Sequence, residues 1–344
     1  MNLLVVLAAL MTLTTTLALL PLNMRLSTRW KLVADPDPRR IHTVQTPEAG
    51  GLSFALPMII LQLLVGLFYR DVYGNQLTGL ALAGLFAVVF GILDDRYELK
   101  PLPKLLGYLG LALVMYLLGF RVLNLTNPFG TEISLSWLSF PVTIFWFLAI
   151  INAINLIDGV DGLAAGITVI TSAVLLVVGI KGSNPLVILV SAMLMMGNLG
   201  FLRYNFHPAR IFMGDTGATF IGLNLAAITT AGDAQFKGIT SMTLIIPLAV
   251  MAIPLLDVAF AIVRRISKGK VFTADKAHIH HTMLGMGLSQ RAISIIVYVV
   301  TLLFGLIAIG FSFTDKKILF LVLMGALCLM VILAYILMRL ELKK

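Results

Sequence analysis

The sequence predicts an all-α, polytopic integral membrane protein with about eleven transmembrane helices. Three observations support this fold class. Of the 344 residues, 59% are hydrophobic and only 12% are charged, whereas about a quarter of the residues in soluble domains are charged. The mean hydropathy is +1.00. Finally, the chain contains eleven long intervals without a charged residue, so a soluble enzyme would lack the charged surface that it needs.

The charge-free intervals define the expected helices in chain order. A bilayer core of about 30 Å is crossed by about 20 apolar residues in an α-helix, and shorter intervals reach that length with polar flanks or tilt. We expect the first interval to be a span and not a signal peptide, because it has no basic n-region. The intervals are Met1–Met24, Ala49–Tyr69, Val72–Leu93, Leu105–Phe120, Ile133–Ile157, Gly162–Ile180, Gly182–Leu202, Thr216–Gly232, Gly238–Leu256, Ala292–Thr314 and Ile318–Met338.

The same composition excludes two other classes of protein. Disordered chains combine low hydrophobicity with dense charge, which is the reverse of this composition. A disulfide-stabilised scaffold is excluded because Cys328, inside an apolar run, is the only cysteine.

The basic residues predict how the chain is oriented in the membrane. If the N-terminus lies outside and the loops alternate, 19 of the 25 Lys and Arg residues fall in inside segments and 6 fall outside. Cytoplasmic loops carry an excess of Lys and Arg, so this split predicts an outside N-terminus and a cytoplasmic C-terminus. The net charge of +9 then reflects topology and attraction to anionic lipid, and no nucleic-acid partner is needed to explain it.

The acidic residues indicate which face carries the functional site. Those assigned outside are scattered singly, whereas those assigned inside are clustered and border the spans. Carboxylates at the hydrocarbon edge are costly and usually functional. We therefore expect one membrane-embedded domain, residues 1-344, with its active site on the cytoplasmic face, formed by loops 24-49, 94-104, 152-161, 203-216 and 264-291.

Two adjacent acids end the third expected span, in GILDDRYELK. Asp94 and Asp95 could form a solvated helix end. However, adjacent carboxylates repel each other, and a helix C-terminus disfavours anions. A divalent cation or a role in proton transfer would account for their position.

The segment NAINLIDGVDGLAAG contains a second cluster. Asn155, Asp158 and Asp161 are spaced by three, so they would share one face of a helix. The glycines beside them leave backbone that a ligand or another helix can approach closely. Packing alone explains the glycines, but it does not explain two acids and an amide on one stripe.

A third cluster precedes the eighth expected span, in YNFHPARIFMGDTGATFIG. Asp215 or Thr216 could be an ordinary helix N-cap. With Asn205 and His207 upstream and other acids on the same face, we favour Asp215 as a Mg²⁺ ligand, because Mg²⁺ takes one or two carboxylates together with substrate phosphate oxygens.

Histidine and arginine supply the complementary charge. His278, His280 and His281 lack the spacing of a helical zinc site, and imidazoles beside basic residues suit the binding of a diphosphate. Near the second expected span lie Arg39, Arg40 and His42. Acids for a metal and cations for phosphates together indicate phosphoryl transfer at a membrane surface.

Six motifs in order resemble the polyprenyl-phosphate N-acetylhexosamine-1-phosphate transferases, a family of the glycosyltransferase 4 type. The resemblance covers residues 1–300, and it is nearest to the branch that transfers N-acetylglucosamine-1-phosphate. His278-Ile279-His280-His281 departs from the three consecutive histidines of the phospho-MurNAc-pentapeptide translocases. Arg40 replaces the Lys of many members, which keeps the charge but changes its geometry. The motifs are RRIHTVQTPEAGGL, GILDDRYELKPLPK, NAINLIDGVDGLAAG, YNFHPARIFMGDTGATFIG, PLLDVAFAIVRRI and ADKAHIHH.

The resemblance implies a reaction and a set of roles. UDP-N-acetylglucosamine and undecaprenyl phosphate would give the lipid-linked pyrophosphate sugar and UMP, with Mg²⁺ or Mn²⁺ as its substitute, at the bacterial inner membrane. Asp215, with Asp158, would bind the metal, and Asp94 or Asp95 would be the base. The remaining residues would bind substrate: Asn155, Asp161 and Asn205 at the nucleotide, and His278, His280, His281, Arg39, Arg40 and His42 at the pyrophosphate.

Several alternatives stay open at this stage. The sugar nucleotide could carry MurNAc-pentapeptide, and an Asp could act as a covalent nucleophile. A secondary transporter is the rival of a different class, although it would place acids near the bilayer midplane. Asp257, inside the ninth expected span, is either a structural polar contact or a pocket residue. A homodimer is one of the oligomeric states left open.

Overall fold

The computed structural model of the chain describes residues 2–34, 45–125, 133–231, 287–310 and 316–341. Part of the predicted site lies outside these residues. The expected span Gly238–Leu256 and seven single residues cannot be placed: Arg39, Arg40, His42, Asp257, His278, His280 and His281.

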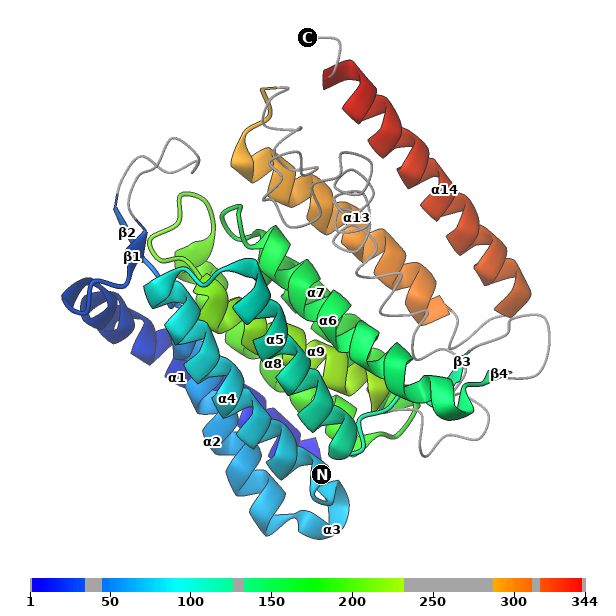
Figure 1. The fold of residues 1–344 in the computed structure, drawn as a ribbon, viewed down its shortest axis with the longest axis horizontal. Coiled ribbons are helices and arrows are strands. Elements are labelled where there is room, and N and C mark those ends of the chain that lie inside the picture. The colour runs from blue at the N-terminus through cyan, green and yellow to red at the C-terminus, as the bar shows by residue number, and fades with distance from the viewer. Residues whose placement is uncertain (1, 35–44, 126–132, 232–286, 311–315, 342–344) are drawn as a thin grey trace.

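The described residues form a helical bundle with two short strand pairs (Figure 1). Ten of the eleven expected intervals coincide with α-helices, and six helices within the described residues are long and apolar enough to cross a membrane. The protein is therefore a multi-pass membrane protein, and the full count of eleven spans and the orientation stay predictions. The helices are α1 Asn2–Arg29, α2 Leu52–Phe68, α3 Arg70–Tyr73, α4 Gln76–Tyr97, α5 Pro101–Leu117, α6 Ser139–Ile157, α7 Leu163–Lys181, α8 Pro185–Asn205, α9 Gly214–Thr230, α13 Gln290–Gly310 and α14 Lys316–Glu341.

The strand pairs were not expected from the sequence. Strand β1, Val33–Ala34, pairs antiparallel with β2, Thr46–Pro47. At another part of the bundle β3, Asn124–Leu125, pairs antiparallel with β4, Ile133–Ser134, and the short 3₁₀-helix Ser136–Leu138 then leads into α6. These ladders are only two residues long, which is too short to show a periodic pattern.

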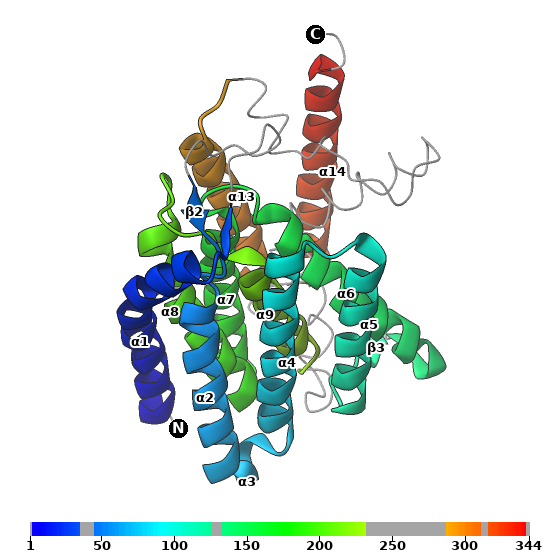
Figure 2. The same cartoon turned by 60° about the vertical axis from the view of Figure 1, so that its left-hand side comes forward.

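Helix α9 lies at the centre of the bundle. Every residue from Thr216 to Thr230 is buried, and α2, α4, α6, α7 and α8 all contact the helix (Figure 2). It has few large side chains and several polar ones, and a helix that is buried on all sides needs no apolar stripe. Its amides and hydroxyls are used internally: Gln62 of α2 donates to Asn224 at 3.1 Å, and Trp146 of α6 donates to Thr229 at 2.9 Å.

Glycines bring the neighbouring helices onto α9. A Cβ at Gly91 of α4 would overlap the backbone of Thr216, and a Cβ at Gly51, beside the start of α2, would overlap Gly217. Small residues allow this close backbone approach between membrane helices. Consequently the end of α4, which carries Asp94 and Asp95, lies against the start of α9.

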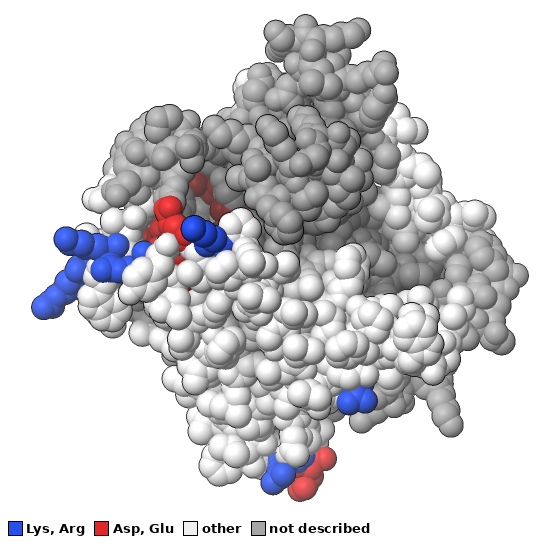
Figure 3. Space-filling view, viewed as in Figure 1, with Lys and Arg blue, Asp and Glu red and all other residues white. Residues whose placement is uncertain are grey.

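On the face shown in Figure 3, the surface of the bundle is apolar between two charged ends. In Figure 3 the described Lys, Arg, Asp and Glu side chains lie toward the ends, and the surface between them is uncharged. Large apolar side chains are exposed on this surface, for example Phe86 at 53% on α4 and Leu106 at 57% on α5. Such a surface is matched to lipid rather than to water.

Candidate active site

Asp95 binds the N-terminus of α9 from a different helix. Its Oδ1 accepts the backbone N–H of Asp215 at 2.6 Å, and its Oδ2 accepts both the N–H of Thr216 at 3.1 Å and the Thr216 hydroxyl at 2.6 Å. A carboxylate at a helix N-terminus satisfies free N–H groups and interacts favourably with the helix dipole. The Asp95 side chain therefore caps the N-terminus of α9, although it lies 120 residues earlier in the chain.

The turn before α9 requires a glycine for two reasons. Gly214 has φ +73°, in the left-handed region. In addition, a Cβ at this position would lie 2.6 Å from Asp95 Oδ2 and 3.0 Å from the Ala49 nitrogen. Glycine alone meets both conditions without strain, so the GDTG segment positions Asp215 directly beside the Asp95 carboxylate.

Lys104, in the first turns of α5, joins two of the predicted acids. Its Nζ lies 2.7 Å from Asp215 Oδ1, where it donates a hydrogen bond, and 2.9 Å from Asp94 Oδ2, where it forms an ion pair without hydrogen-bond alignment. Asp94 Oδ1 also accepts the backbone N–H of Leu99 at 3.1 Å. The Asp94 side chain is only 3% exposed, whereas Asp215 is 25% exposed. Asp215 is thus the more accessible of these two acids.

Asn155 and Asp158 approach the same group from the end of α6. The Asn155 side-chain amide donates to Asp215 Oδ1. Asp158 is the C-cap residue of α6. Desolvation by the surrounding protein raises the pKa of the Asp158 carboxyl well above its usual value, and the carboxylates of Asp215, Asp95 and Glu48 raise this pKa further. The Asp158 carboxyl therefore lies within electrostatic range of Asp215, Asp95 and Glu48.

Asp161 and Asn205 support the turn between α6 and α7. Asp161 Oδ2 contacts His207 Nδ1 at 2.8 Å and accepts the N–H of Ala209 at 3.1 Å. The buried Asn205 accepts the N–H of Gly162 at 3.1 Å and donates to the Ile211 carbonyl at 2.9 Å. Both residues therefore connect this turn to the 206–213 segment, which leads into Gly214. The Asn205 side chain uses both its donor and its acceptor inside the protein.

The segment before α2 is bonded to the same loop. Gly50 N donates to the Phe212 carbonyl and Gly51 N to the Met213 carbonyl, each at 2.9 Å. From α1, Asn23 donates to the Ala49 carbonyl at 3.0 Å, and Ser27 donates to the Glu48 carbonyl at 2.8 Å. The backbone around Asp215 is thus held from both α1 and α2.

Three side chains of α13 hold the α6–α7 turn from the other side. Gln290 Oε1 accepts the N–H of Asp161 at 3.3 Å, and the Ser294 hydroxyl donates to the Asp161 carbonyl at 3.1 Å. The Tyr298 hydroxyl donates to the Gly162 carbonyl at 2.5 Å. These residues are spaced by four and lie on one face of the helix. Sequence reasoning did not identify them.

The structure brings five predicted residues into one cluster, which we call the acid cluster: Asp94, Asp95, Asn155, Asp158 and Asp215. Asp161 and Asn205 lie beside it in the supporting network. Sequence reasoning missed Lys104, although one signal was present. A lysine in the first turn of an apolar helix opposes the helix dipole, so its position suggests a nearby anion.

The donor set of the acid cluster fits a hard divalent cation. The Lys104 ammonium group pairs with Asp94 and Asp215, while Asp95 and Asp158 lie near Asp215 without a described cation partner, so the acids of the cluster outnumber its described cations. Within the described residues, no three His, Cys, Asp or Glu side chains are close enough to hold a metal by themselves. Mg²⁺ does not need three, because it binds through one or two carboxylates and completes its shell with water and substrate phosphates.

Comparison with known proteins finds a matching family and relatives that align with most of the chain. A sequence model described as glycosyl transferase family 4 matches residues 77–233. The chain is 36% identical over 307 residues to a probable undecaprenyl-phosphate N-acetylglucosaminyl 1-phosphate transferase of Bacillus subtilis strain 168, covering 89% of this chain and 84% of the relative. It is 34% identical over 315 residues to a decaprenyl-phosphate N-acetylglucosaminephosphotransferase of Mycobacterium leprae, covering 84% and 78%.

A third relative has a different substrate in its name. A phospho-N-acetylmuramoyl-pentapeptide-transferase of Halalkalibacterium halodurans is 30% identical over 278 residues, covering 77% of this chain and 82% of the relative. Since all three alignments extend over more than two thirds of each protein, and the matched region contains the acid cluster, the chain belongs to glycosyl transferase family 4 and is a polyprenyl-phosphate N-acetylhexosamine-1-phosphate transferase in type, as its motifs predict.

Proposed function

We propose that this protein transfers N-acetylglucosamine-1-phosphate from UDP-N-acetylglucosamine to undecaprenyl phosphate. An oxygen of the lipid phosphate attacks the phosphorus that carries the sugar, and the bond from this phosphorus to UMP breaks. The products are UMP and the lipid-linked pyrophosphate sugar that starts a cell-envelope polysaccharide. The observation that carries the proposal is the acid cluster at one end of a membrane bundle, in a chain aligned along most of its length with transferases of this kind.

The metal of this reaction would be Mg²⁺, with Mn²⁺ as a substitute. Asp215 and Asp158 are the residues that would hold it, because Asp215 is partly exposed and Asp158 interacts with it electrostatically. When bound, the ion would neutralise the charge that develops on the phosphates. Asn155 donates to the Asp215 carboxylate and so orients it.

Asp94 and Asp95 have different surroundings, which suggests different roles. Asp95 uses both oxygens to cap α9, so its part is to hold Asp215 in place. Asp94 is paired with Lys104, and the Asp94 carboxylate is the better candidate to receive a proton from the lipid phosphate. Because phosphate monoesters have a second pKa of about 6, the nucleophile is largely ionised already, and positioning contributes more than proton removal.

A covalent route is the mechanistic alternative. An aspartate would attack the sugar-bound phosphorus, release UMP and then pass the phosphosugar to the lipid phosphate. Direct transfer inverts the configuration at this phosphorus, whereas two successive displacements retain it. The stereochemical outcome with a chiral phosphate therefore distinguishes the two routes.

The pyrophosphate would be bound by residues outside the described part of the chain. His278, His280, His281, Arg39, Arg40 and His42 remain our candidates for this role, on the basis of their charge and their motifs. Asp161 and Asn205 would act near the nucleotide by holding the α6–α7 turn. The positive-inside distribution supports an active site on the cytoplasmic face of the bacterial inner membrane.

A second candidate substrate is UDP-MurNAc-pentapeptide. It is favoured only by the alignment with the phospho-N-acetylmuramoyl-pentapeptide-transferase, which is less similar and shorter than that with the Bacillus subtilis relative. The chemistry at phosphorus would be unchanged.

The test is UMP release by the purified full-length protein in detergent. We expect release that requires undecaprenyl phosphate, UDP-N-acetylglucosamine and Mg²⁺. Asp215→Asn should lower the rate by about 10²–10³-fold, the scale for removing one charge-stabilising group. Asp71→Asn is the matched control, because Asp71 is exposed at the far end of α2, in α3, and should leave the rate unchanged.

Other outcomes decide between the alternatives. Turnover only with UDP-MurNAc-pentapeptide would move the protein to the peptidoglycan branch. Failure to release UMP with both sugar nucleotides would contradict the proposed reaction.

A further inference from the structure

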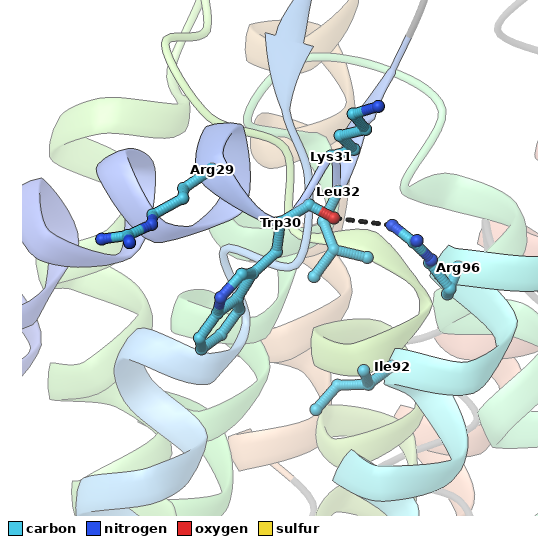
Figure 4. A pocket seen from close by; sticks show the side chains of 6 residues that line it. All are labelled: Arg29, Trp30, Lys31, Leu32, Ile92 and Arg96. Atoms are coloured by element: carbon cyan, nitrogen blue, oxygen red, sulfur yellow. Dashed lines mark hydrogen bonds between the residues drawn. The ribbon is translucent and has the colours of Figure 1, made fainter.

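A groove outside the acid cluster carries three cations and an apolar floor. It has a volume of 540 Å³ and is lined by Arg29, Trp30, Lys31, Leu32, Ile92 and Arg96. Figure 4 shows that these side chains come from the end of α1, the turn that follows it and the end of α4. Arg96 Nη1 donates to the Trp30 carbonyl at 2.6 Å and so holds the two walls together.

The turn at the end of α1 places Lys31 in the groove at a conformational cost. Leu32 N donates to the Ser27 carbonyl at 2.8 Å and Lys31 N donates to the Thr28 carbonyl at 3.3 Å, which is the Schellman arrangement of a helix C-terminus. The left-handed residue of this arrangement is usually glycine, yet Lys31 occupies it with φ 57°. The backbone therefore does not explain why a lysine stands here.

The charge of the groove is not balanced within the protein as far as it is described. Within the described ranges, no carboxylate lines the groove, and no Asp or Glu lies within ion-pair distance of Arg29, Lys31 or Arg96. Figure 4 shows that Arg29 extends away from Lys31 and Arg96, so the three cations line the groove from different sides. Cations that line a groove without an acid are complementary to an anion. Two of the three are guanidinium groups, whose fork geometry suits phosphate oxygens.

The groove also lies at a boundary between apolar and charged surface. On α1 the exposed apolar side chain of Leu22, 51% exposed, precedes the groove, and on α4 Leu93 is 45% exposed just before Arg96. The lipid-facing surface thus ends where the cations begin. Trp30 is 55% exposed at this boundary, the place where tryptophan is enriched in membrane proteins.

We propose that this groove binds the headgroup of an anionic phospholipid, with the phosphodiester at Lys31 and Arg96, the glycerol backbone against Trp30 and Ile92, and Arg29 adding positive charge at the edge of the groove. The site is separate from the acid cluster. Arg96 follows Asp95 directly in the chain, and Ser27 holds the segment that pairs with the loop before Gly214. A bound lipid would therefore brace the junction of α1 and α4 beside the acid cluster.

The test uses Trp30 as the reporter, in full-length protein reconstituted into phosphatidylcholine bilayers. A small fraction of the lipid is brominated, either as phosphatidylglycerol or as phosphatidylcholine, and quenching of tryptophan fluorescence is measured. Comparison with Trp30→Phe isolates the Trp30 signal from the other two tryptophans. We expect brominated phosphatidylglycerol to quench Trp30 at a mole fraction at least tenfold lower than brominated phosphatidylcholine does.

Two variants and a matched control test the cations. Arg29→Gln/Lys31→Gln/Arg96→Gln should abolish the preference for phosphatidylglycerol. Lys31→Gly should lower the preference for phosphatidylglycerol about fivefold, which is the contribution of one basic residue near an anionic surface. Because glycine adopts the left-handed backbone without strain, misfolding cannot explain this loss. Arg203→Gln/Arg210→Gln changes two exposed cations outside the groove and should leave the preference intact.

Four results would overturn the proposal. Equal quenching by both brominated lipids would show that no anionic site exists. An equal loss in the Arg203/Arg210 control would show a diffuse surface effect. Displacement by millimolar glycerol phosphate would indicate a site for free phosphates, and displacement by stoichiometric undecaprenyl phosphate would assign the groove to a polyprenyl phosphate. Because the readout is binding, it is independent of the proposed catalytic function.

Discussion

Replacing Asp95 by alanine tests whether this carboxylate holds the start of α9. The substitution removes the acceptor of three donors: the N–H groups of Asp215 and Thr216 and the Thr216 hydroxyl. Within the described residues, no other side chain accepts a hydrogen bond from these three donors. The prediction concerns the local structure of α9 and can be measured without any substrate.

The expected cost follows from the number and kind of these bonds. An N-cap replaced by alanine costs about 1 kcal/mol, and hydrogen bonds to a charged group contribute about 1.5–3 kcal/mol each. The freed groups at the partly exposed end of α9 can bind water, which offsets part of this loss. We therefore expect Asp95→Ala to lower the local stability of the α9 N-terminus by about 3 kcal/mol. Asp95→Asn keeps an acceptor oxygen and should cost about half as much.

The assay is hydrogen exchange at the Asp215 and Thr216 amides in detergent. Because about 1.4 kcal/mol corresponds to tenfold in an equilibrium constant, Asp95→Ala should accelerate exchange at both amides by roughly a hundredfold. Asp71→Ala, at the other end of the bundle, should not change it. If exchange at these amides stayed within about threefold of the wild-type rate, Asp95 would not be the cap of α9, and a purely chemical role would replace our interpretation.

Three further substitutions test other contacts. Lys104→Met leaves the buried Asp94 carboxylate unpaired and should lower the free energy of unfolding, measured by chemical denaturation, by about 3 kcal/mol. The double variant Asp94→Asn/Lys104→Met should recover part of this loss. If the losses of stability of the two single variants simply added in the double variant, the ion pair would be refuted. Gly51→Ala forces α2 away from Gly217 and should cost about 2 kcal/mol, whereas Gly110→Ala, with open space around it, should not lower the thermal midpoint. Tyr298→Phe removes the bond to the Gly162 carbonyl, so exchange across residues 158–162 should accelerate about fivefold; an unchanged rate would show that α13 does not hold this turn.

The membrane helices were predictable because their signal is local. A run of about 20 residues without charge has few alternatives to a spanning helix, and all the intervals within the described residues coincide with helices. The strand pairs β1–β2 and β3–β4 were not predictable, because two-residue ladders depend on where the flanking helices place the chain.

The acid cluster was predictable in its membership but not in the contacts of each member. Asp94 and Asp95 are equivalent in sequence, and only the packing of α4 against α9 turns one toward Lys104 and the other toward Thr216. Asn205 was expected at the nucleotide, whereas its side chain joins Gly162 to Ile211. Neither distinction has a signal in local residue spacing.

The polar residues of α13 illustrate why supporting contacts escape a sequence reading. Gln290, Ser294 and Tyr298 are unremarkable residues on an apolar helix, and their partners are backbone atoms of Asp161 and Gly162. Because the partners are backbone atoms, the residue types of the α6–α7 turn do not indicate these contacts. Such contacts become visible only when the two segments are seen together.

The most direct test of the central claim follows the phosphorus during the reaction. The purified protein is given undecaprenyl phosphate, Mg²⁺ and UDP-N-acetylglucosamine labelled with ³²P in the phosphate that carries the sugar. Our account predicts that the label enters the lipid fraction together with the sugar, that unlabelled UMP is released in equal amount, and that Asp215→Asn lowers the rate of both by about 10²–10³-fold. Label released in UDP, with an unlabelled glycosylated lipid, would show transfer of the sugar alone and would contradict the account.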